Sequence, residues 1–285
     1  MDIKKRTIPM TKESRNLLLF FVATFVATWV AYFIIVFNGW NPYTMPGLVF
    51  LLVGGGAPSW VGILIVLFTY DREQRLDYFR RCLSFRQIKL PYWAFIIFVF
   101  PLIFAFTISI SLLMGGSMPG MPNLKAYIAQ PWIIPMALFM SFLSGPWSEE
   151  FGWRGYSLDP LIKRFGILRG SALLGFIWGF WHLPLFFMPD TWHGHNGFAF
   201  VGFWTFMLYS IGNAMIISWV YLGTKRSILS GFMMHLAGNF TSNAFYPYSD
   251  GIEIMRMIMV MVLGLVLLSF LERRSKQVSW AQVPA

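Results

Sequence analysis

The segment WSEEFGWRGY, residues 147–156, places two adjacent carboxylates and a guanidinium directly after the uncharged run of residues 131–146. Such a run is typical of a membrane helix, where a charged side chain at the centre costs roughly 2.5–3.5 kcal/mol. If Glu149, Glu150 and Arg154 all faced lipid, the cost would be on the order of 8–10 kcal/mol, less any relief near a helix end. We therefore expect all three side chains to face the protein interior or a water-filled cavity.

Helical geometry gives the two carboxylates different roles. Glu150 lies four residues before Arg154, which is the favourable order for an ion pair within a helix. At about 100° per residue, Glu149 lies about 140° around the helix from Arg154 and is not committed to that pair. One carboxylate is thus interpreted as structural and the other as free for chemistry. The alternative is that all three charges only brace neighbouring helices.

Two more groups of polar residues lie in apolar segments further along the chain. GFIWGFWHLPLFF holds His182, with Trp178 about one turn earlier on the same face. SGFMMHLAGNFTSNAF holds His235 and Asn239 four residues apart, hence also on one face, and Ser242 continues that stripe. Taken singly, a lone histidine on a helix is usually a packed, hydrogen-bonded residue, and a polar stripe usually joins membrane helices.

The composition is that of a polytopic membrane protein. Of the 285 residues, 57% are hydrophobic and only 12% are charged, about half the charged fraction of a soluble domain. The net charge of +10 would suit a nucleic-acid partner, but the basic residues form short clusters between apolar runs. We attribute these clusters to membrane topology, and expect the lipid bilayer and no nucleic acid as a partner. The single cysteine, Cys82, excludes an internal disulfide framework and a cysteine-rich metal site.

A membrane-spanning helix needs about 20 mostly apolar residues. On this basis the sequence predicts an all-α fold: a polytopic bundle of about eight transmembrane helices in a single integral membrane domain, residues 1–285. The predicted spans are 16–37, 46–70, 92–114, 131–156, 171–188, 199–222, 228–246 and 252–271. The first is interpreted as a retained span, because it is too long for a signal peptide and lacks a small-residue cleavage site.

The basic residues give these spans an orientation. Nineteen of the 22 Lys and Arg residues lie in the N-terminal tail, in the loops after the second, fourth and sixth spans, or in the C-terminal tail; the others are Lys125, Arg154 and Arg256. By the positive-inside rule, both termini are cytoplasmic in a multi-pass protein of the cell membrane. The basic and apolar segment Asp71–Leu90 predicts an amphipathic helix along the cytoplasmic surface or, equally, a solvated loop.

The polar groups of the three segments are predicted to lie at a similar depth in the membrane. Glu149, His182 and His235 lie about seven, eleven and seven residues from the predicted cytoplasmic ends, or roughly 10–17 Å deep. A carboxylate beside an imidazole in a low-dielectric pocket is suited to general-base activation of water. A second histidine with Asn239 would donate hydrogen bonds to a developing oxyanion. The combination indicates hydrolysis.

The order of these groups resembles the three motifs of the CPBP (CAAX-processing and bacteriocin-processing, or Abi) intramembrane proteases, which include the type II CAAX prenyl proteases. The resemblance covers residues 129–245, the fourth to seventh predicted spans, which we take as the catalytic core of the bundle. The motifs EExxxR, aromatic-xxx-H and HxxxN are formed here by Glu149, Glu150, Arg154, Trp178, His182, His235 and Asn239. The aromatic residue is usually Phe in the family, and Trp178 keeps a bulky apolar face.

The resemblance implies an intramembrane endopeptidase that cleaves a membrane-associated protein or peptide, of the CAAX or bacteriocin type. It implies four catalytic and three supporting residues: Glu149, His182, His235 and Asn239, supported by Glu150, Arg154 and Trp178. We expect Glu149 and His182 to activate water, and His235 and Asn239 to hold the oxyanion.

The family is described both as metal-dependent and as glutamate-dependent. We favour a site without a cofactor, because HExxH is absent and Asn is a poor zinc ligand but a good oxyanion donor. The alternative is a zinc-dependent version of the same protease, a metalloprotease with Glu149, His182 and His235 as ligands and an open water position.

His193 and His195, in TWHGHNG, could suggest a metal pair, but they fall on the opposite side of the membrane from the other groups; we expect an exposed loop there. The competing function classes are a non-catalytic membrane immunity factor or scaffold, and a small-solute transporter. A transporter would be expected to show two-fold repetition of broken helices, and none is visible. The complete set of motif residues favours the protease over the scaffold.

Overall fold

The computed structural model describes residues 11–277, and within that range every regular element is a helix. The all-α prediction is therefore confirmed; the basic residues Lys4, Lys5 and Arg6 lie outside the described range. The α-helices are α1 (Lys12–Asn38), α2 (Gly47–Gly55), α3 (Ala57–Thr69), α4 (Arg72–Cys82), α5 (Leu90–Leu113), α6 (Pro122–Ala129), α7 (Ile134–Phe142), α8 (Ser148–Gly152), α9 (Leu158–Phe165), α10 (Ile167–Trp181), α11 (Trp192–Asn196), α12 (Thr205–Gly223), α13 (Ile228–Phe245) and α14 (Asp250–Gln277). Short 3₁₀ segments are η1 (Phe85–Gln87), η2 (Pro131–Ile133) and η5 (Leu183–Phe187), and π segments are η3 (Leu143–Trp147), η4 (Trp153–Ser157) and η6 (Phe200–Trp204).

Seven of the eight predicted spans have a counterpart among the described residues. Five helical stretches are long and apolar enough to cross a membrane, and two bent pairs raise the number to seven if each pair is one span. The five are Lys12–Asn38, Leu90–Leu113, Ile167–Phe187, Phe200–Gly223 and Asp250–Ser275, and the pairs are Gly47–Gly55 with Ala57–Thr69 and Pro122–Ala129 with Pro131–Phe165. The chain is thus a polytopic helical membrane protein.

Two of the predicted spans differ from the helices in the structure. The segment 228–246 forms α13, but its Ser, His, Asn and Thr side chains make it too polar to count as a span by composition. The predicted fourth span, 131–156, is part of a longer pair bent by 109°, and its helical path continues to Phe165. The break falls at Gln130–Pro131, where the proline disfavours a helical conformation for the residue before it.

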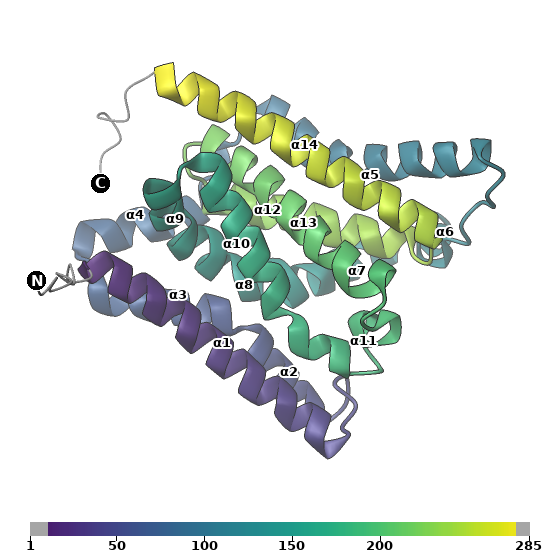
Figure 1. The fold of residues 1–285 in the computed structure, drawn as a ribbon, viewed down its shortest axis with the longest axis horizontal. Coiled ribbons are helices and arrows are strands. Elements are labelled where there is room, and N and C mark those ends of the chain that lie inside the picture. The colour runs from purple at the N-terminus through teal and green to yellow at the C-terminus, as the bar shows by residue number, and fades with distance from the viewer. Residues whose placement is uncertain (1–10, 278–285) are drawn as a thin grey trace, which may run out of the picture.

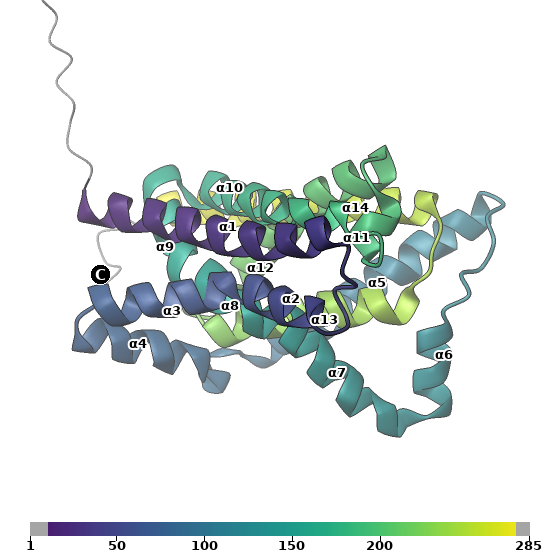
Figure 2. The same cartoon turned by 90° about the horizontal axis from the view of Figure 1, so that it is seen from below.

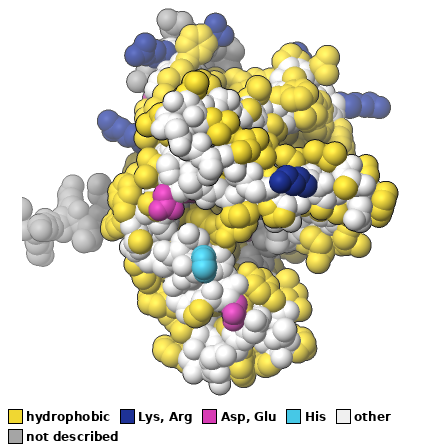
Figure 3. Space-filling model, turned by 90° about the vertical axis from the view of Figure 1, so that its right-hand side faces the viewer, with side chains coloured by type: hydrophobic (Ala, Val, Ile, Leu, Met, Phe, Trp, Pro, Cys, Tyr) yellow, Lys and Arg dark blue, Asp and Glu magenta, His cyan; other side chains and the backbone are white. Residues whose placement is uncertain are grey.

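Helix α12 is the central element of the bundle. It packs against α10, α13 and α14, and twelve of its 19 residues are buried. Helix α14 runs along one side and α1 along the opposite side, and α1 begins at the end of the bundle where α14 finishes (Figure 1). Helices α6 and α7 project at the other end (Figure 2), and none of their residues is buried. Charged side chains are sparse on that end face (Figure 3).

Helix α8, which carries the adjacent carboxylates, lies between two π segments and against α3. Pro146 inside η3 cannot donate a backbone hydrogen bond, which accounts for a wider turn there. Gly62 of α3 and Gly152 of α8 let the two backbones touch, because a Cβ on Gly62 would lie 2.9 Å from Gly152 Cα. A Cβ on Gly152 would overlap the carbonyl oxygen of Pro58. Small residues allow this close approach of membrane helices.

The segment Asp71–Leu90 is largely helical, so the helix and not the solvated loop is correct for residues 72–82. Asp71 caps α4, and the side of α4 that bears Tyr78 is buried against the bundle. The Tyr78 hydroxyl donates a hydrogen bond of 2.7 Å to the carbonyl oxygen of Phe151. Helix α4 therefore supports α8 directly. Its place on the cytoplasmic surface stays a prediction, as does the single-domain organisation.

The contact between α3 and α8 gives a first prediction. Gly152→Ala forces a methyl group into the Pro58 carbonyl, and overpacking of this kind typically costs about 1–3 kcal/mol. We expect a clearly lower thermal unfolding midpoint for the purified protein in detergent. The control is Gly251→Ala in the first turn of α14, where the nearest atom to the added Cβ is 4.0 Å away. Equal midpoints for the Gly152 variant and wild type would contradict the close packing.

Candidate active site

Glu149 lies in α8 with its side chain buried and turned toward α10. Its Oε2 accepts two indole N–H groups, from Trp153 Nε1 at 3.2 Å and from Trp178 Nε1 at 2.5 Å. Among the described residues, Oε1 has no hydrogen-bond partner, and it is not fully enclosed. One oxygen of Glu149 thus fixes the side chain, and the other is available to a water molecule or a substrate.

Glu150 pairs with Arg154, as the spacing predicts, and also contacts His235. Its Oε1 lies 2.7 Å from Arg154 Nη1, and all of this pair is buried. The same oxygen also lies 2.8 Å from His235 Nδ1, on α13. A single carboxylate oxygen therefore joins the EExxxR and HxxxN segments, which are 85 residues apart in the chain.

Trp178 of α10 contacts Glu149, Arg154 and both motif histidines. Its indole N–H donates to Glu149, and its ring lies edge-to-face with His235 at 5.2 Å between centroids. The Arg154 guanidinium carbon lies 4.9 Å from the indole centroid, a cation–π contact. The ring centroid of His182 lies 6.0 Å away. The sequence predicts only a bulky apolar role for Trp178; its N–H donor, which the Phe usual at this position does not have, was missed.

Hydrogen bonds fix one ring nitrogen of each motif histidine. His182 Nδ1 lies 2.8 Å from the Trp178 carbonyl oxygen, which can only accept, so Nδ1 carries a proton. In the neutral ring, His182 Nε2 is then an acceptor. His235 Nδ1 faces the Glu150 carboxylate and likewise carries a proton. His235 Nε2 is therefore an acceptor in the neutral ring and a donor in the imidazolium.

Asn239 lies one turn after His235 on α13, and Gly145 of η3 lies opposite both. A Cβ built on Gly145 would overlap Asn239 Nδ2 and lie 2.9 Å from His235 Nε2. The two side-chain nitrogens thus converge on one point beside the Gly145 backbone. The absence of a side chain at Gly145 is what lets Asn239 and His235 lie against its backbone.

The expectation for His193 was wrong. Its ring lies nearly parallel to that of His182, at 5.6 Å between centroids and 22° between planes. The reason is that η5 continues the span of α10 to Phe187 and the chain turns only after it, so that α11 packs back with His193 against His182. Burial, and then the neighbouring His182 ring, lower the pKa of His193 well below its usual value. His195, on the same short helix, is exposed as expected.

Ser242 continues the stripe of α13 but belongs to a separate cluster. Its Oγ accepts a hydrogen bond of 3.2 Å from Arg256 Nη1. Arg256 in turn pairs with Glu253 at 2.7 Å and lies over the Tyr209 ring at 4.2 Å. This second buried ion pair joins α14 to α12 and α13, which accounts for the charge of Arg256 within an otherwise apolar helix.

The zinc alternative needs Glu149, His182 and His235 around one ion, and these residue types suit that metal. Glu149 Oε1, His182 Nε2 and His235 Nε2 are each available as ligand atoms. Within residues 11–277, however, no group of three or more His, Cys, Asp or Glu side chains is arranged so that it could hold a metal ion.

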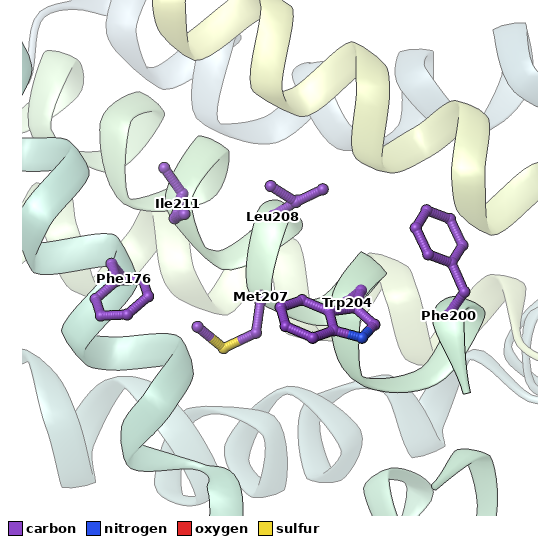
Figure 4. A pocket seen from close by; sticks show the side chains of 6 residues that line it. All are labelled: Phe176, Phe200, Trp204, Met207, Leu208 and Ile211. Carbon is purple, nitrogen blue, oxygen red and sulfur yellow. The ribbon is translucent and has the colours of Figure 1, made fainter. Parts of the chain in front are cut away.

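An apolar pocket lies on a different part of the bundle, between α10 and α12. Its volume is about 420 Å³, and none of its lining residues belongs to the three motifs. Figure 4 shows these residues: Phe176, Phe200, Trp204, Met207, Leu208 and Ile211. With no titratable group in its wall, this pocket has no chemistry of its own.

Comparisons with known proteins agree with the motifs. Residues 130–241 match the family described as type II CAAX prenyl endopeptidase Rce1-like. The chain is also 25% identical over 232 residues to CAAX prenyl protease 2 of Methanococcus maripaludis, covering 78% of this chain and 82% of that protein. The class that these findings and the helical fold support is a membrane endopeptidase. The resemblance found in the sequence is thereby confirmed: over residues 130–241 the chain is similar to the CPBP, or Rce1-like, family.

The buried network gives a second prediction. Arg154→Met removes the guanidinium from the buried Glu150 carboxylate and leaves it only its contact with His235. Breaking a buried pair in this way is expected to cost about 3–5 kcal/mol and to lower the thermal midpoint sharply. The control, Lys163→Met, breaks the Lys163–Glu13 pair, whose side chains are 74% and 52% exposed, and should change stability by no more than about 1 kcal/mol. In the double variant Arg154→Met/Glu150→Gln the buried charge of Glu150 is also removed, so the thermal midpoint should recover in part. Equal midpoints for the two single variants would contradict the network.

Proposed function

We propose that the protein is a metal-free intramembrane endopeptidase, with Glu149 and His182 activating water and His235 and Asn239 holding the oxyanion. One observation carries the proposal: the Trp178 indole donates to Glu149, and its ring lies beside the rings of both His182 and His235. In the proposed mechanism Glu149 Oε1 and His182 Nε2 are the acceptors, and the attacking water donates one O–H to each. Such a water has its lone pairs directed away from both acceptors, toward a substrate carbonyl.

Charge balance supports the oxyanion role of His235. Since Glu150 holds the proton on Nδ1, His235 can donate through Nε2 only as the imidazolium. With Glu149 and Glu150 ionised and Arg154 cationic, a cationic His235 makes the group of four neutral. A neutral cluster is the arrangement that costs least in a low-dielectric interior.

The reaction then follows from these positions. Glu149 takes a proton from the water as the water oxygen bonds to the carbonyl carbon, and the carbonyl oxygen becomes an oxyanion. His235 Nε2–H and Asn239 Nδ2–H donate to that oxyanion beside Gly145, which lowers the barrier. When the tetrahedral intermediate collapses, the C–N bond breaks and Glu149 returns the proton to the leaving amine. The products are a new carboxylic acid and a new amine.

The substrate class is proposed from the relative and from the bundle. The matched protein is named for its action on prenylated CAAX proteins. A membrane-associated protein or peptide that carries a lipid group can reach a buried site from the bilayer, so we propose a prenylated CAAX-type substrate. A bacteriocin-type peptide is the alternative to be compared with it.

Substitutions in the site give the third prediction. Asn239→Ala removes one oxyanion donor and should lower kcat about 100- to 1000-fold with the fold intact. Glu149→Gln removes the base and should be at least as damaging. The matched control is Asn243→Ala, one turn further along α13, whose side chain bonds Tyr127 and Asn123 away from the site. Cleavage of a prenylated CAAX peptide in detergent, read by mass spectrometry, gives the rates.

The same assay separates the two mechanisms. We expect full activity after dialysis against a chelator and less than stoichiometric zinc by elemental analysis. Stoichiometric zinc that is lost in His182→Ala and His235→Ala, with activity restored by added zinc, would overturn the metal-free mechanism. It would leave the protease itself in place.

We also propose that both termini are cytoplasmic in the cell membrane, which gives the fourth prediction. Cys82 is buried, so it can be replaced by Ser and single cysteines placed at the exposed residues Ser117 and Glu73. In whole cells, a membrane-impermeant maleimide should label Ser117→Cys, in the loop after α5, and should label Glu73→Cys only after lysis. Labelling of both variants in intact cells would contradict the orientation.

A further inference from the structure

His193 is the one histidine beside the site that belongs to none of the three motifs. It lies on α11, which is held in place by Thr191: the Thr191 hydroxyl donates to the Leu185 and Met188 carbonyls and accepts from the Gly194 N–H. The His193 ring is thereby fixed over the face of His182, at 5.6 Å between centroids. The hydrogen bonds of Thr191 therefore fix the contact between the two histidine rings.

The Nε2 atom of His193 is buried and has no hydrogen-bond partner among the described residues. Aromatic edges surround the ring, from Phe206 at 4.7 Å, Phe186 at 5.1 Å and Trp192 at 5.2 Å between centroids. An apolar wall of this kind supplies no partner, and a buried polar atom without one is rare and costly in native proteins. A ligand that enters the site can supply the missing partner.

We propose that His193 is a substrate-binding residue, whose Nε2 forms a hydrogen bond with the backbone of the peptide as its scissile bond reaches His182. The inference rests on the proposed endopeptidase function. An extended peptide presents both N–H and C=O groups, so either tautomer of the neutral imidazole finds a partner. The stacked contact with His182 places this hydrogen bond directly beside the residue that orients the attacking water.

The test uses three variants of the full-length protein. His193→Phe keeps an aromatic ring over His182 and removes both nitrogens. His193→Gln returns a polar atom at about the position of Nε2. His195→Phe makes the same change at the exposed neighbour on α11 and serves as the control. Thermal midpoints in detergent establish that each variant is folded.

Two quantities are measured for each variant, using the prenylated peptide that the wild type cleaves. The first is the separate kcat and KM for cleavage, and the second is the Kd for the same peptide with its scissile amide reduced to a methylene amine. We expect His193→Phe to raise KM and Kd about ten-fold, the effect of one lost hydrogen bond that leaves a group unpaired, with kcat within about two-fold. His193→Gln should recover most of the affinity, and His195→Phe should match the wild type.

The outcomes separate the two claims. Equal Kd values for His193→Phe and wild type would overturn the role of His193 and leave the protease intact. A loss of kcat with unchanged Kd in His193→Phe would also overturn it, because the ring would then act only through His182. If the wild type cleaves no peptide of the prenylated or bacteriocin type, the proposed function fails, and the role of His193 fails with it.

Discussion

A single oxygen atom, Glu150 Oε1, holds the candidate site together. It accepts from Arg154 at 2.7 Å and from His235 at 2.8 Å, in a place where all three side chains are buried. An ionised carboxylate there would be very costly if it were alone, and pairing it makes the burial tolerable. Because the pair lies within α8 and η4 while His235 lies on α13, the same electrostatic requirement that stabilises the charge also fixes the distance between the two helical segments.

The other constraint is that Glu149 must be both fixed and available. Two indole donors, from Trp153 and Trp178, hold its Oε2, and Oε1 is left without a partner among the described residues. Trp178 performs a second task, since its ring packs against His235 and under Arg154. A rigid aromatic residue with one N–H thus positions the proposed base relative to the proposed oxyanion donors. The pre-formed geometry is what electrostatic catalysis requires, because the groups need no rearrangement as charge develops.

Local periodicity explains how much of this could be predicted from the sequence. The Glu150–Arg154 pair and the shared faces of α10 and α13 follow from spacings of three and four residues, which depend on the helix alone. The 109° bend, the π segments around α8 and the return of α11 onto His182 depend on tertiary packing, and an average over hydropathy does not register them. His193 was misplaced for that reason.

The donor role of Trp178 was missed because an aromatic residue in an apolar helix was interpreted only by its size. Composition alone also fails to identify α13 as a membrane span. The polar residues that α13 contributes to the candidate site lower its mean hydropathy below that of a typical span.

The central claim is that Glu149 delivers a water molecule to the peptide bond and does not itself bond to the substrate. Oxygen labelling in a single turnover tests this most directly. Excess wild-type protein cleaves the prenylated peptide once in water enriched in ¹⁸O, and mass spectrometry measures the label in the new carboxylate. The account predicts one ¹⁸O atom in the product of that first turnover. An unlabelled first product, with the label appearing only in later turnovers, would show that an oxygen of the protein had been transferred, and would contradict the account.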